Sequence, residues 1–494
     1  MLLNLDNIIF LQVHPNLCNL VVKYMGGILM LIKTLIDGQI VSEQVILSES
    51  AVNIPNIFVT KFDDINSLVI DSFFDRVDIV PTSLLDGKNI FILNRYSQTH
   101  LASGVETVKC LYEQSLKNDV ATKQQFIFSI CPTYSCNMNC VYCFENDTIS
   151  HMKEVSAEDL TDILELVKKE ITVIRQSNSK TSIDIELFGG EPLQERNKHL
   201  VEMVLQFARE NKCQSTIITN GYELLGFVTT FVKYRDVLSK VNTTLDGTEA
   251  THNMRRRLKS RKGSFEEISS GIDRLLKLGL RVGVQTNVDK ENIDNLKDIF
   301  CYYESQGWTA MENFNAEIAR VDDKYGSGNR CVLSETDIVK KIISIFSYEP
   351  PRWLNLAFIK SPERVSKMAG VSFNQNEYGK ALYHYCWATS PIIKGCYIGT
   401  SKEMYRCTVT VPSEQFKCGE LGRDEILGYE DLWLNNSCFS RNECLNCDIG
   451  GFCGGGCVIE KQTKDFNSIC EYEKTNFKAF IEEVLIPRMK RMMA

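Results

Sequence analysis

The chain has 494 residues, of which 44% are hydrophobic and 24% charged, and its formal net charge is −8. This composition is typical of a globular protein with about two to four domains, and its acidic balance excludes a broad basic surface for nucleic acid. Nineteen cysteines without a recognisable secretory signal favour metal or cluster ligation in a reducing cytoplasm over a disulfide framework. We therefore expect a cytoplasmic protein that binds no nucleic acid.

Residues 1–120 contain few motifs and are expected to form a small α+β N-terminal domain. The apolar spacing from Leu17 to Ile36 predicts an amphipathic helix interrupted by two glycines, and the run from Asn89 to Leu93 predicts a strand. The longest membrane-like stretch, from Tyr24 to Ile32, is far shorter than the roughly 20 residues of a spanning helix, so we expect no membrane partner.

Three cysteines follow the predicted strand Phe126–Ile130 in a C-x3-C-x2-C pattern, namely Cys136, Cys140 and Cys143. The same spacing fits one face of a helix, but the proline and asparagines around it disfavour a regular helix. A zinc site would need a fourth ligand, for which Cys131 is the nearest candidate. Three thiolates without a close fourth suit a [4Fe–4S] cluster with one open iron, which can bind a substrate or cofactor.

From about residue 121 to 335, short strands alternate with helices in the manner of a parallel sheet or barrel. Ser156 and Asp159 predict a capped helix start. Further strands are predicted at residues 182–188, 215–219, 241–245, 280–285 and, more loosely, 309–317. A glycine or polar motif follows each of the first four, and the carboxyl ends of parallel barrel strands form one face, where such folds place their active sites.

Two of these motifs can bind a charged ligand. Gly189-Gly190-Glu191-Pro192 combines glycines, which allow close backbone approach, with a carboxylate that can accept from an ammonium group; the alternative is a plain turn into a helix. The basic run from Arg255 to Lys262 is unusual in an acidic chain. We expect at least one of its arginines to bind an anion, although most such runs are solvated surfaces.

Residues 336–380 are expected to form a helical bridge, and residues 381–494 are again rich in cysteine. The block Cys444-x2-Cys447-x5-Cys453-x3-Cys457 could by itself be a zinc ribbon, but the tail holds more thiols than one zinc ion can use. Several Fe–S clusters would use them.

Cys136, Cys140 and Cys143, with Tyr142 before the last of them, resemble the signature of the radical S-adenosylmethionine (SAM) enzymes. The resemblance implies a partial (β/α)6 TIM-like barrel over residues 121–335. It also implies that a [4Fe–4S] cluster binds SAM at its open iron and cleaves it to methionine and a 5′-deoxyadenosyl radical. In that role the three cysteines are the catalytic centre.

The same resemblance implies a set of SAM contacts. Gly189, Gly190 and Glu191 would bind the methionine amino group, and Arg256 would hold the carboxylate, with Arg255 or Arg257 as alternatives if the alignment slips by one place. Thr244 and, more weakly, Asn287 would face the ribose. Tyr142 would address the adenine through its backbone.

The tail resembles the SPASM extension, which holds two auxiliary [4Fe–4S] clusters in peptide-modifying members of the family. The resemblance implies that Cys444, Cys447, Cys453 and Cys470 hold the outer cluster. The inner cluster would use Cys386, Cys407 and Cys457, with Cys396 as a further candidate. Lys402 stands where a glycine is expected, which leaves this ligand set open.

These features favour a radical SAM/SPASM maturase that forms a thioether or carbon–carbon crosslink in a ribosomally made precursor peptide. In peptide-modifying members of the family a region in this position often docks the leader segment of the precursor, so residues 1–120 are expected either to do this or to be a plain structural extension. We expect a reductant such as flavodoxin or ferredoxin to supply electrons. One alternative is a sulfatase-maturating type that makes formylglycine; Cys407 is followed by Thr408 and not by the aspartate of those relatives, although His384 or Glu403 could replace that base. The other alternative is a non-catalytic, cluster-stabilised peptide-binding scaffold.

Overall fold

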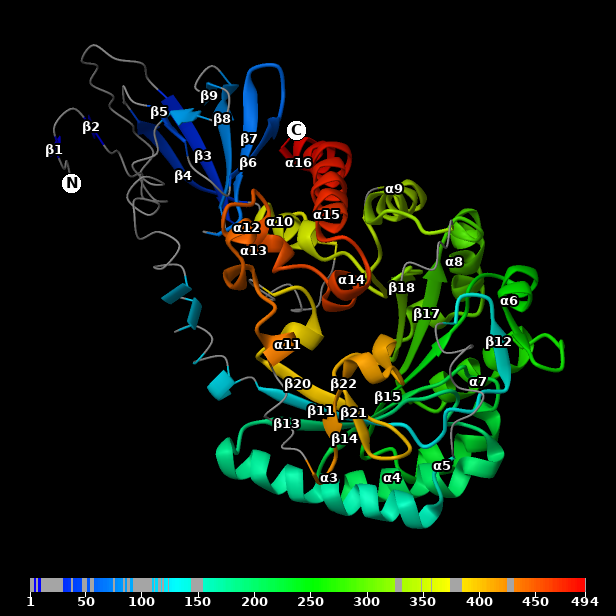
Figure 1. Ribbon diagram of the computed structural model, residues 1–494. Coiled ribbons are helices and arrows are strands. Elements are labelled where there is room, and N and C mark those ends of the chain that lie inside the picture. The colour runs from blue at the N-terminus through cyan, green and yellow to red at the C-terminus, as the bar shows by residue number, and fades with distance from the viewer. Residues whose placement is uncertain are drawn as a thin grey trace. The chain divides into compact units, whose positions relative to one another are not determined.

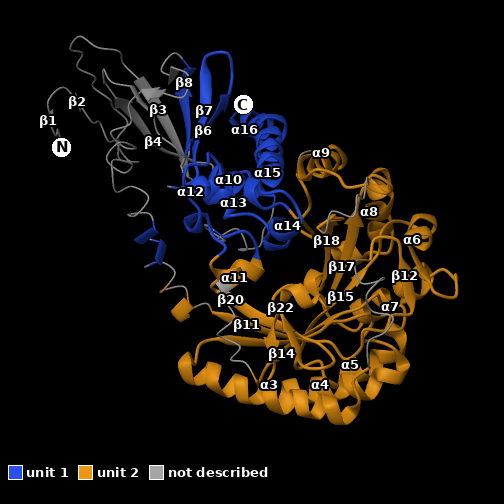
Figure 2. Ribbon diagram, in the orientation of Figure 1, with its two compact units in different colours: residues 1–115, 359–386, 436–494 blue, residues 116–358, 387–435 orange. Residues whose placement is uncertain are grey.

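The computed structural model describes residues 124–143, 154–324, 331–347, 349–356, 358–373, 384–423 and 431–493 and, before residue 124, chiefly the strands given below. The chain divides into two compact units (Figure 2). Unit 1 comprises residues 1–115, 359–386 and 436–494, and unit 2 comprises residues 116–358 and 387–435. The domain boundaries expected from the sequence were placed according to its motifs, and they stay a prediction.

Unit 2 is built on a ten-stranded sheet in the order β19-β18-β17-β15-β14-β13-β11-β20-β21-β22 (Figure 1). The pairs from β19 to β20 are parallel, and the last two pairs are antiparallel. The strands are β11 (Gln125–Ile130), β13 (Ser182–Leu187), β14 (Gln214–Ile218), β15 (Leu238–Thr244), β17 (Val282–Val288), β18 (Phe314–Arg320), β19 (Leu354–Asn355), β20 (Ile393–Ile398), β21 (Glu403–Tyr405) and β22 (Lys417–Glu420).

Helices connect these strands and cover the apolar face of the sheet (Figure 1). They are α3 (Ala157–Ser177), α4 (Lys198–Glu210), α5 (Val228–Lys233), α6 (Glu249–Arg255), α7 (Phe265–Lys277), α8 (Leu296–Ser305) and α9 (Glu335–Ile345). A further short helix, α11 (Asp431–Leu434), follows the last strand of the sheet. In β13, Ile185 and Leu187 are fully buried, whereas Asp184 and Glu186 alternate with them on the other face. The second face of the sheet is therefore polar, and it faces away from the helices.

The parallel sheet confirms the expected α/β class with a partial barrel. The predicted capping box is present, because the Ser156 hydroxyl accepts from the backbone N–H of Asp159 (3.0 Å). Two strands lie later than predicted: β17 runs on to Val288 and β18 begins at Phe314, since the two pair along seven residues. Asn287 consequently lies inside a strand and not after it.

Unit 1 combines strands from the start of the chain with helices from its end. A five-stranded antiparallel sheet has the order β4-β3-β8-β7-β6. Its strands are β3 (Met30–Ile36), β4 (Gln39–Ile46), β6 (Ile57–Lys61), β7 (Asn66–Asp71) and β8 (Arg76–Pro81), and smaller sheets pair β1 (Asn4–Leu5) with β2 (Ile8–Ile9) and β10 (Asn89–Phe91) with β5 (Ala51–Asn53) and β9 (Leu85–Asp86).

The helices of unit 1 are α10 (Ser361–Met368), α12 (Asn442–Leu445), α13 (Gly450–Cys453), α14 (Val458–Thr463), α15 (Phe466–Phe480) and α16 (Ile486–Met493). Phe58 of β6 packs edge-on against Phe477 of α15, with ring centroids 5.2 Å apart, and the Thr60 hydroxyl donates to Glu482 (2.6 Å). The C-terminal helices thus complete the core of the N-terminal sheet.

The helix predicted from Leu17 to Ile36 is wrong over its last seven residues, which form β3, and its earlier part lies outside the described residues. The described elements up to residue 91 are strands, so that part of the expected α+β domain is β structure. β3 pairs with the adjacent β4 in a hairpin and with β8 more than forty residues later, and this strand pairing outweighs the helical periodicity. Among the described helices, none is both long and apolar enough to cross a membrane.

Candidate active site

The loop after β11 is held by the glycine pair that follows β13. The backbone N–H of Gly190 donates to the carbonyl of Thr133 (3.0 Å), and that of Glu191 donates to the carbonyl of Ser135 (3.0 Å). A Cβ atom on Gly190 would lie 2.2 Å from the carbonyl oxygen of Tyr134, so only glycine allows this approach. The cysteine loop and the Gly-Gly-Glu-Pro segment therefore form one structure.

The Glu191 side chain is buried and links two strand ends through hydrogen bonds. Its carboxylate accepts from the backbone N–H of Leu193 (2.7 Å), the hydroxyl of Thr219 (2.6 Å) and the backbone N–H of Asn220 (2.5 Å). Burial raises the pKa of Glu191 to about 7, although these donors act to lower it. The carboxylate thus fixes the end of β13 to the end of β14, beside the cysteine loop.

Two of the loop cysteines, Cys136 and Cys140, lie in an environment that disfavours free thiolates. Burial, followed by the charge of Glu191, raises the pKa of Cys136 to about 12, and burial also raises the pKa of Cys140. The Asn220 amide donates to the Cys136 sulfur (3.7 Å), and the backbone N–H of Cys143 donates to the carbonyl of Cys140 (3.2 Å). A thiolate here needs a cation beside it, and a bound metal centre would supply one.

No three Cys, His, Asp or Glu side chains among the described residues are arranged around the position of a single metal ion. A single zinc ion would need all of its thiolates about 2.3 Å away, whereas a cubane cluster takes one thiolate on each iron and spreads them apart. The loop, with three cysteines and a backbone fixed from two sides, fits the demands of a cluster.

A two-stranded ladder joins the cysteine loop to the basic run. β12 (Met138–Cys140) pairs antiparallel with β16 (Arg256–Leu258), and Cys140 lies opposite Arg256. Side chains alternate across the ladder: Met138, Cys140, Arg256 and Leu258 are buried, whereas Asn139 and Arg257 are exposed. The buried face of the ladder thus carries a cysteine and an arginine side by side.

The three consecutive arginines have different surroundings. Arg255 is 1% exposed and makes a two-point ion pair with Asp289 (2.8 and 3.0 Å). Arg257 is exposed. Arg256 is buried, forms no ion pair with any described residue, and has an Nε without a hydrogen-bond partner there. Of the three, Arg256 is therefore the one available to bind a carboxylate within the site.

The hydroxyl of Tyr142 is the centre of a hydrogen-bond network. It donates to Asp246 (2.5 Å), and it accepts from the guanidinium of Arg256 (2.6 Å) and the amide of Asn287 (2.9 Å). Burial acts to lower the pKa of Arg256, but the nearby Cys140, Tyr142 and Asp246 outweigh it and raise that pKa. The side chain of Tyr142 thus orients the arginine, a role that the sequence analysis did not assign to it.

The two expected ribose contacts lie on neighbouring strands. Thr244 is the last residue of β15 and is partly buried, and Asn287 lies on β17, which pairs with β15. The backbone N–H of Asn287 donates to Asp246 (3.0 Å), so the Asp246 side chain links it to Tyr142. The structure therefore gathers the expected SAM contacts at the carboxyl ends of the parallel strands.

In unit 1, the four cysteines assigned to the outer cluster lie near one another. Burial raises the pKa of Cys453 strongly, and the neighbouring Glu473, Cys447, Cys444 and Cys470 add to that effect. Cys438 is fully buried against Cys444 and Phe73, and its position next to the proposed outer-cluster cysteines was not predicted. Its signal in the sequence was only its place among the tail cysteines.

The residues assigned to the inner cluster fall in both units, and the structure does not place the units relative to one another. Cys386 and Cys457 belong to unit 1, whereas Cys407 and Cys396 belong to unit 2. Within unit 2, Cys396 of β20 lies opposite Phe128 of β11, and its side chain lies on the other face of β20 from that of the next residue, Tyr397. Cys407 helps to raise the pKa of Tyr397, so Cys407 lies near Tyr397. The inner ligand set stays a prediction.

The turn before Cys407 keeps the backbone shape expected there. Lys402 has φ +70°, in the left-handed region that glycine adopts without strain. The neighbouring Glu403, offered by the sequence as an alternative base, accepts from the hydroxyl of Tyr134 (2.8 Å) and the backbone N–H of Ser401 (2.8 Å). These two bonds give Glu403 a structural role.

His384, the other alternative base, is buried in unit 1. Burial lowers its pKa to about 4, which makes it a weak proton acceptor near neutral pH.

Three further residues support the site but were not selected from the sequence. Asp246 connects Tyr142 to Asn287, Asp289 neutralises Arg255, and His252 lies between the backbone N–H of Asp246 (3.3 Å) and the hydroxyl of Ser264 (3.0 Å). Asp246 belongs to the polar segment that follows β15, and His252 lies on α6. Nothing in the local sequence pointed to Asp289, because its ion-pair partner Arg255 lies 34 residues away.

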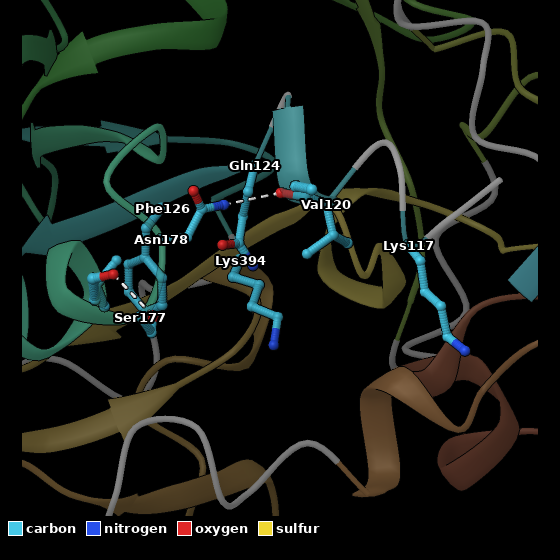
Figure 3. A pocket seen from close by; sticks show the side chains of 9 residues that line it. Lys117, Val120, Gln124, Phe126, Ser177, Asn178 and Lys394 are labelled. Atoms are coloured by element: carbon cyan, nitrogen blue, oxygen red, sulfur yellow. Dashed lines mark hydrogen bonds between the residues drawn. The ribbon is translucent and has the colours of Figure 1, made fainter. Parts of the chain in front are cut away.

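A cavity of about 620 Å³ lies elsewhere in unit 2 (Figure 3). Gln124, Phe126, Asn178 and Lys394 are among the residues that line it, near the start of β11 and the end of α3. The cysteine loop follows the opposite end of β11, and six strand residues span about 20 Å. The cavity therefore does not contain the candidate site.

Residues 130–300 match the model of the Radical SAM superfamily. The chain is similar to the radical SAM cyclopropyl synthase TigE of Paramaledivibacter caminithermalis, with 23% identity over 71% of this chain and 72% of TigE. It is also 24% identical to a serine-type anaerobic sulfatase-maturating enzyme of Bacteroides thetaiotaomicron, over 49% of this chain and 57% of that one. A cysteine-type sulfatase-maturating enzyme of Clostridium novyi is 22% identical over 71% of this chain and 92% of its own.

Two solved structures resemble the fold. The enzyme anSMEcpe, with bound AdoMet (SAM) and the Cp18Cys peptide, aligns with a TM-score of 0.53 and 15% identity over 74% of this chain and 99% of its own. SuiB of Streptococcus suis, bound to the precursor peptide SuiA, aligns with a TM-score of 0.50 and 14% identity over 84% and 97% of the two chains. At these identities the likeness shows the fold alone.

Proposed function

We propose that this chain is a radical SAM enzyme, with a [4Fe–4S] cluster and SAM, that modifies a ribosomally made precursor peptide by forming a thioether or carbon–carbon crosslink. The match of residues 130–300 to the Radical SAM superfamily model and the similarity to TigE support this proposal. The proposal that the chain is an enzyme sets aside the alternative of a non-catalytic peptide-binding scaffold. The observation that carries the proposal is the joining of the cysteine loop, the glycine pair and Arg256 into one site at the strand ends.

We assign the SAM-binding cluster to Cys136, Cys140 and Cys143. When bound, the cluster and SAM would supply the 5′-deoxyadenosyl radical that abstracts hydrogen. Arg256 would hold the SAM carboxylate, since its Nε lacks a partner and it has no ion pair among the described residues. Gly189, Gly190 and Glu191 would receive the amino group.

Thr244 and Asn287 would line the ribose, and Tyr142 would contact the adenine through its backbone. Its side chain would meanwhile orient Arg256, which needs a fixed geometry to make two parallel bonds to a carboxylate.

We assign two auxiliary clusters to the SPASM-like tail, which gives three clusters in all. The outer one would use Cys444, Cys447, Cys453 and Cys470, and their mutual proximity in unit 1 supports that choice. The inner one would use Cys386, Cys407 and Cys457, with Cys396 the weakest candidate because of its position on β20.

A peptide is the proposed substrate because two structural neighbours, anSMEcpe and SuiB, were each solved with a bound peptide. Thr408, which follows Cys407, supports a crosslink over formylglycine. Its hydroxyl stays protonated near neutral pH and therefore cannot act as a base in the way that a carboxylate does. Residues 1–120 are proposed to bind a leader segment. We further propose a cytoplasmic enzyme that uses an electron carrier and binds neither nucleic acid nor membrane.

The test is anaerobic coexpression of the chain with each small open reading frame that flanks its gene, followed by mass spectrometry of the peptides. Loss of two hydrogens without a free thiol at the affected cysteine fits a thioether, and the same loss with an alkylatable thiol fits a carbon–carbon bond. An aldehyde trapped by a hydrazide would contradict the crosslinking proposal and favour the formylglycine alternative.

A further inference from the structure

The two faces of the β12–β16 ladder differ in chemistry. Its buried face carries Cys140 and Arg256, which belong to the proposed cluster and SAM site. Asn139, which precedes Cys140, and Arg257, which follows Arg256, have exposed side chains on the opposite face. One strand thus separates the proposed cluster from the surface of unit 2, and β12 lies beside α6 at the edge of the partial barrel (Figure 1).

Two large apolar side chains are exposed at this place. Val141, between two of the loop cysteines, is 56% exposed, and Met254, near the end of α6, is 62% exposed. The backbone N–H of Val141 donates to the carbonyl of Arg255 (3.0 Å), which brings the two apolar residues onto adjoining segments. Exposed apolar side chains that gather beside a functional centre are typical of a protein-binding surface.

The basic run that stands out in the sequence divides between the two faces. Arg255 and Arg256 are buried, whereas Arg257, Lys259 and Arg261 are exposed. The three exposed residues form no ion pair with any residue that the structure describes. The backbone N–H of Lys259 donates to the carbonyl of Asn137 in the cysteine loop (2.9 Å), so this basic segment lies next to the loop.

Lys262 is also exposed, but it pairs with Glu267 (2.8 Å) and contributes less positive charge to the surface. The exposed cations stand out in a chain of net charge −8. Such a chain as a whole repels an acidic protein at long range, so a local cluster of cations determines where an acidic partner approaches.

We propose that this exposed face, comprising Val141, Met254, Arg257, Lys259 and Arg261, is the docking surface for a small acidic electron-carrier protein of the flavodoxin class. The inference rests on the proposed function, because only a redox cluster behind the ladder needs an electron from outside. One electron passes from the reduced carrier to the oxidised cluster, and no bond is formed or broken.

Geometry and charge agree on this partner. A carrier on the outer face would lie about one layer, roughly 10 Å, from the Cys140 thiol. Exposed apolar side chains on segments that adjoin exposed cations suit an acidic protein whose cofactor lies near its surface, because charge steers the encounter and apolar contact stabilises the complex.

The experiment compares two donors with the anaerobically reconstituted full chain. Reduced flavodoxin is the protein donor, and photoreduced 5-deazariboflavin is an uncharged small donor that needs no docking surface. Cluster reduction is followed by absorbance and by electron paramagnetic resonance, and 5′-deoxyadenosine release is measured in parallel. The variants are Arg257→Glu/Lys259→Glu and Met254→Gln. The control is Lys180→Glu/Arg281→Glu, which reverses two exposed charges before the starts of β13 and β17.

We expect the rate of reduction by flavodoxin to fall at least 10-fold in the double variant at low salt, and several-fold in Met254→Gln. The rate with deazaflavin should stay within twofold, and the control should resemble the wild type. Salt should slow the flavodoxin reaction of the wild type, because electrostatic steering at this surface is screened.

An unchanged flavodoxin rate in the double variant, or an equal fall in the control, would overturn the docking surface. A parallel fall with both donors would also overturn it, because it would assign the residues to the integrity of the cluster. If deazaflavin reduces no cluster in the wild type, or reduction releases no 5′-deoxyadenosine, the proposed function itself fails, and the inference fails with it.

Discussion

Cys140 and Arg256 lie opposite each other in the antiparallel ladder of β12 and β16. The pairing fixes the distance between a proposed cluster ligand and the proposed SAM-carboxylate ligand through backbone bonds and not through flexible side chains. A bound SAM molecule would therefore find Cys140 and Arg256 at a set spacing, and this preorganisation would reduce the entropy lost on binding.

The first prediction concerns the three arginines. Arg256→Ala should weaken SAM binding by roughly 1.5–3 kcal/mol, or about 10- to 150-fold in Kd, because a charge-assisted bond is lost. The measurement is equilibrium SAM binding to protein with its cluster intact.

Arg257→Ala is the matched control and should leave the Kd unchanged, since its side chain is exposed. Arg255→Ala should instead lower the free energy of unfolding by about 3–5 kcal/mol, because it leaves the buried Asp289 unpaired. If Arg257→Ala weakens SAM binding and Arg256→Ala does not, the assignment of the carboxylate contact is wrong.

The second prediction separates the side chain of Tyr142 from its backbone. Tyr142→Phe keeps the ring but removes the hydroxyl that meets Arg256, Asp246 and Asn287. SAM binding should weaken by about 1 kcal/mol, roughly fivefold in Kd, while iron content stays the same. An unchanged Kd would show that Arg256 is oriented without the hydroxyl.

The third prediction is a pH dependence from Glu186, on the polar face of the parallel sheet. Burial raises its pKa from 4.5 to about 7, although the Ser129 hydroxyl (2.7 Å) acts to lower it. Between these values the folded protein keeps a proton that the unfolded chain has lost, so stability falls as pH rises from about 4.5 to 7 and is then level. At about 1.4 kcal/mol per pKa unit, the full penalty is roughly 3 kcal/mol.

Glu186→Gln should therefore gain stability over the wild type as pH rises through this window, with the gain constant above it. Thermal unfolding from pH 5 to 8.5 measures the difference. Ser129→Ala removes the hydroxyl that stabilises the carboxylate, and it should shift the window to higher pH. A difference between Glu186→Gln and wild type that does not vary over this range would contradict the raised pKa.

The fourth prediction concerns Lys402, whose left-handed φ of +70° strains a residue with a side chain by roughly 1–2 kcal/mol. Lys402→Gly should relieve this strain at a cost of about 0.5–1 kcal/mol in chain entropy. Lys402→Ala removes the same exposed contact to Asp162 but keeps the strain, so it is the matched control. The glycine variant should unfold at a higher temperature than the alanine variant, and the reverse order would contradict the argument.

Much of unit 2 could be predicted from the sequence, because its signals are local. The strands from β11 to β15 show apolar runs that end in polar or glycine motifs, and the parallel order brings those ends together. The resemblance to the family favours Arg256 among the three arginines, but the physical reason for that choice is not local. It depends on Asp289, a partner of Arg255 that lies 34 residues further along the chain.

The N-terminal part of unit 1 was harder to predict for the same reason. The apolar spacing before Ile36 by itself predicts a helix, but residues Lys33 to Leu35 pair with Val77 to Ile79, more than forty residues later. Local periodicity cannot report such pairing. The role of the Tyr142 side chain was missed likewise, because its partners Asp246, Arg256 and Asn287 are more than a hundred residues away.

The central claim is that Cys136, Cys140 and Cys143 hold a cluster that cleaves SAM, and iron content measured together with SAM cleavage tests it most directly. Anaerobically reconstituted wild type should hold about twelve iron atoms in three clusters and release 5′-deoxyadenosine on reduction. The variant with all three cysteines changed to alanine should hold about eight iron atoms and release none. An unchanged iron content in that variant, or a wild type that binds iron at the loop but releases no 5′-deoxyadenosine, would contradict the account.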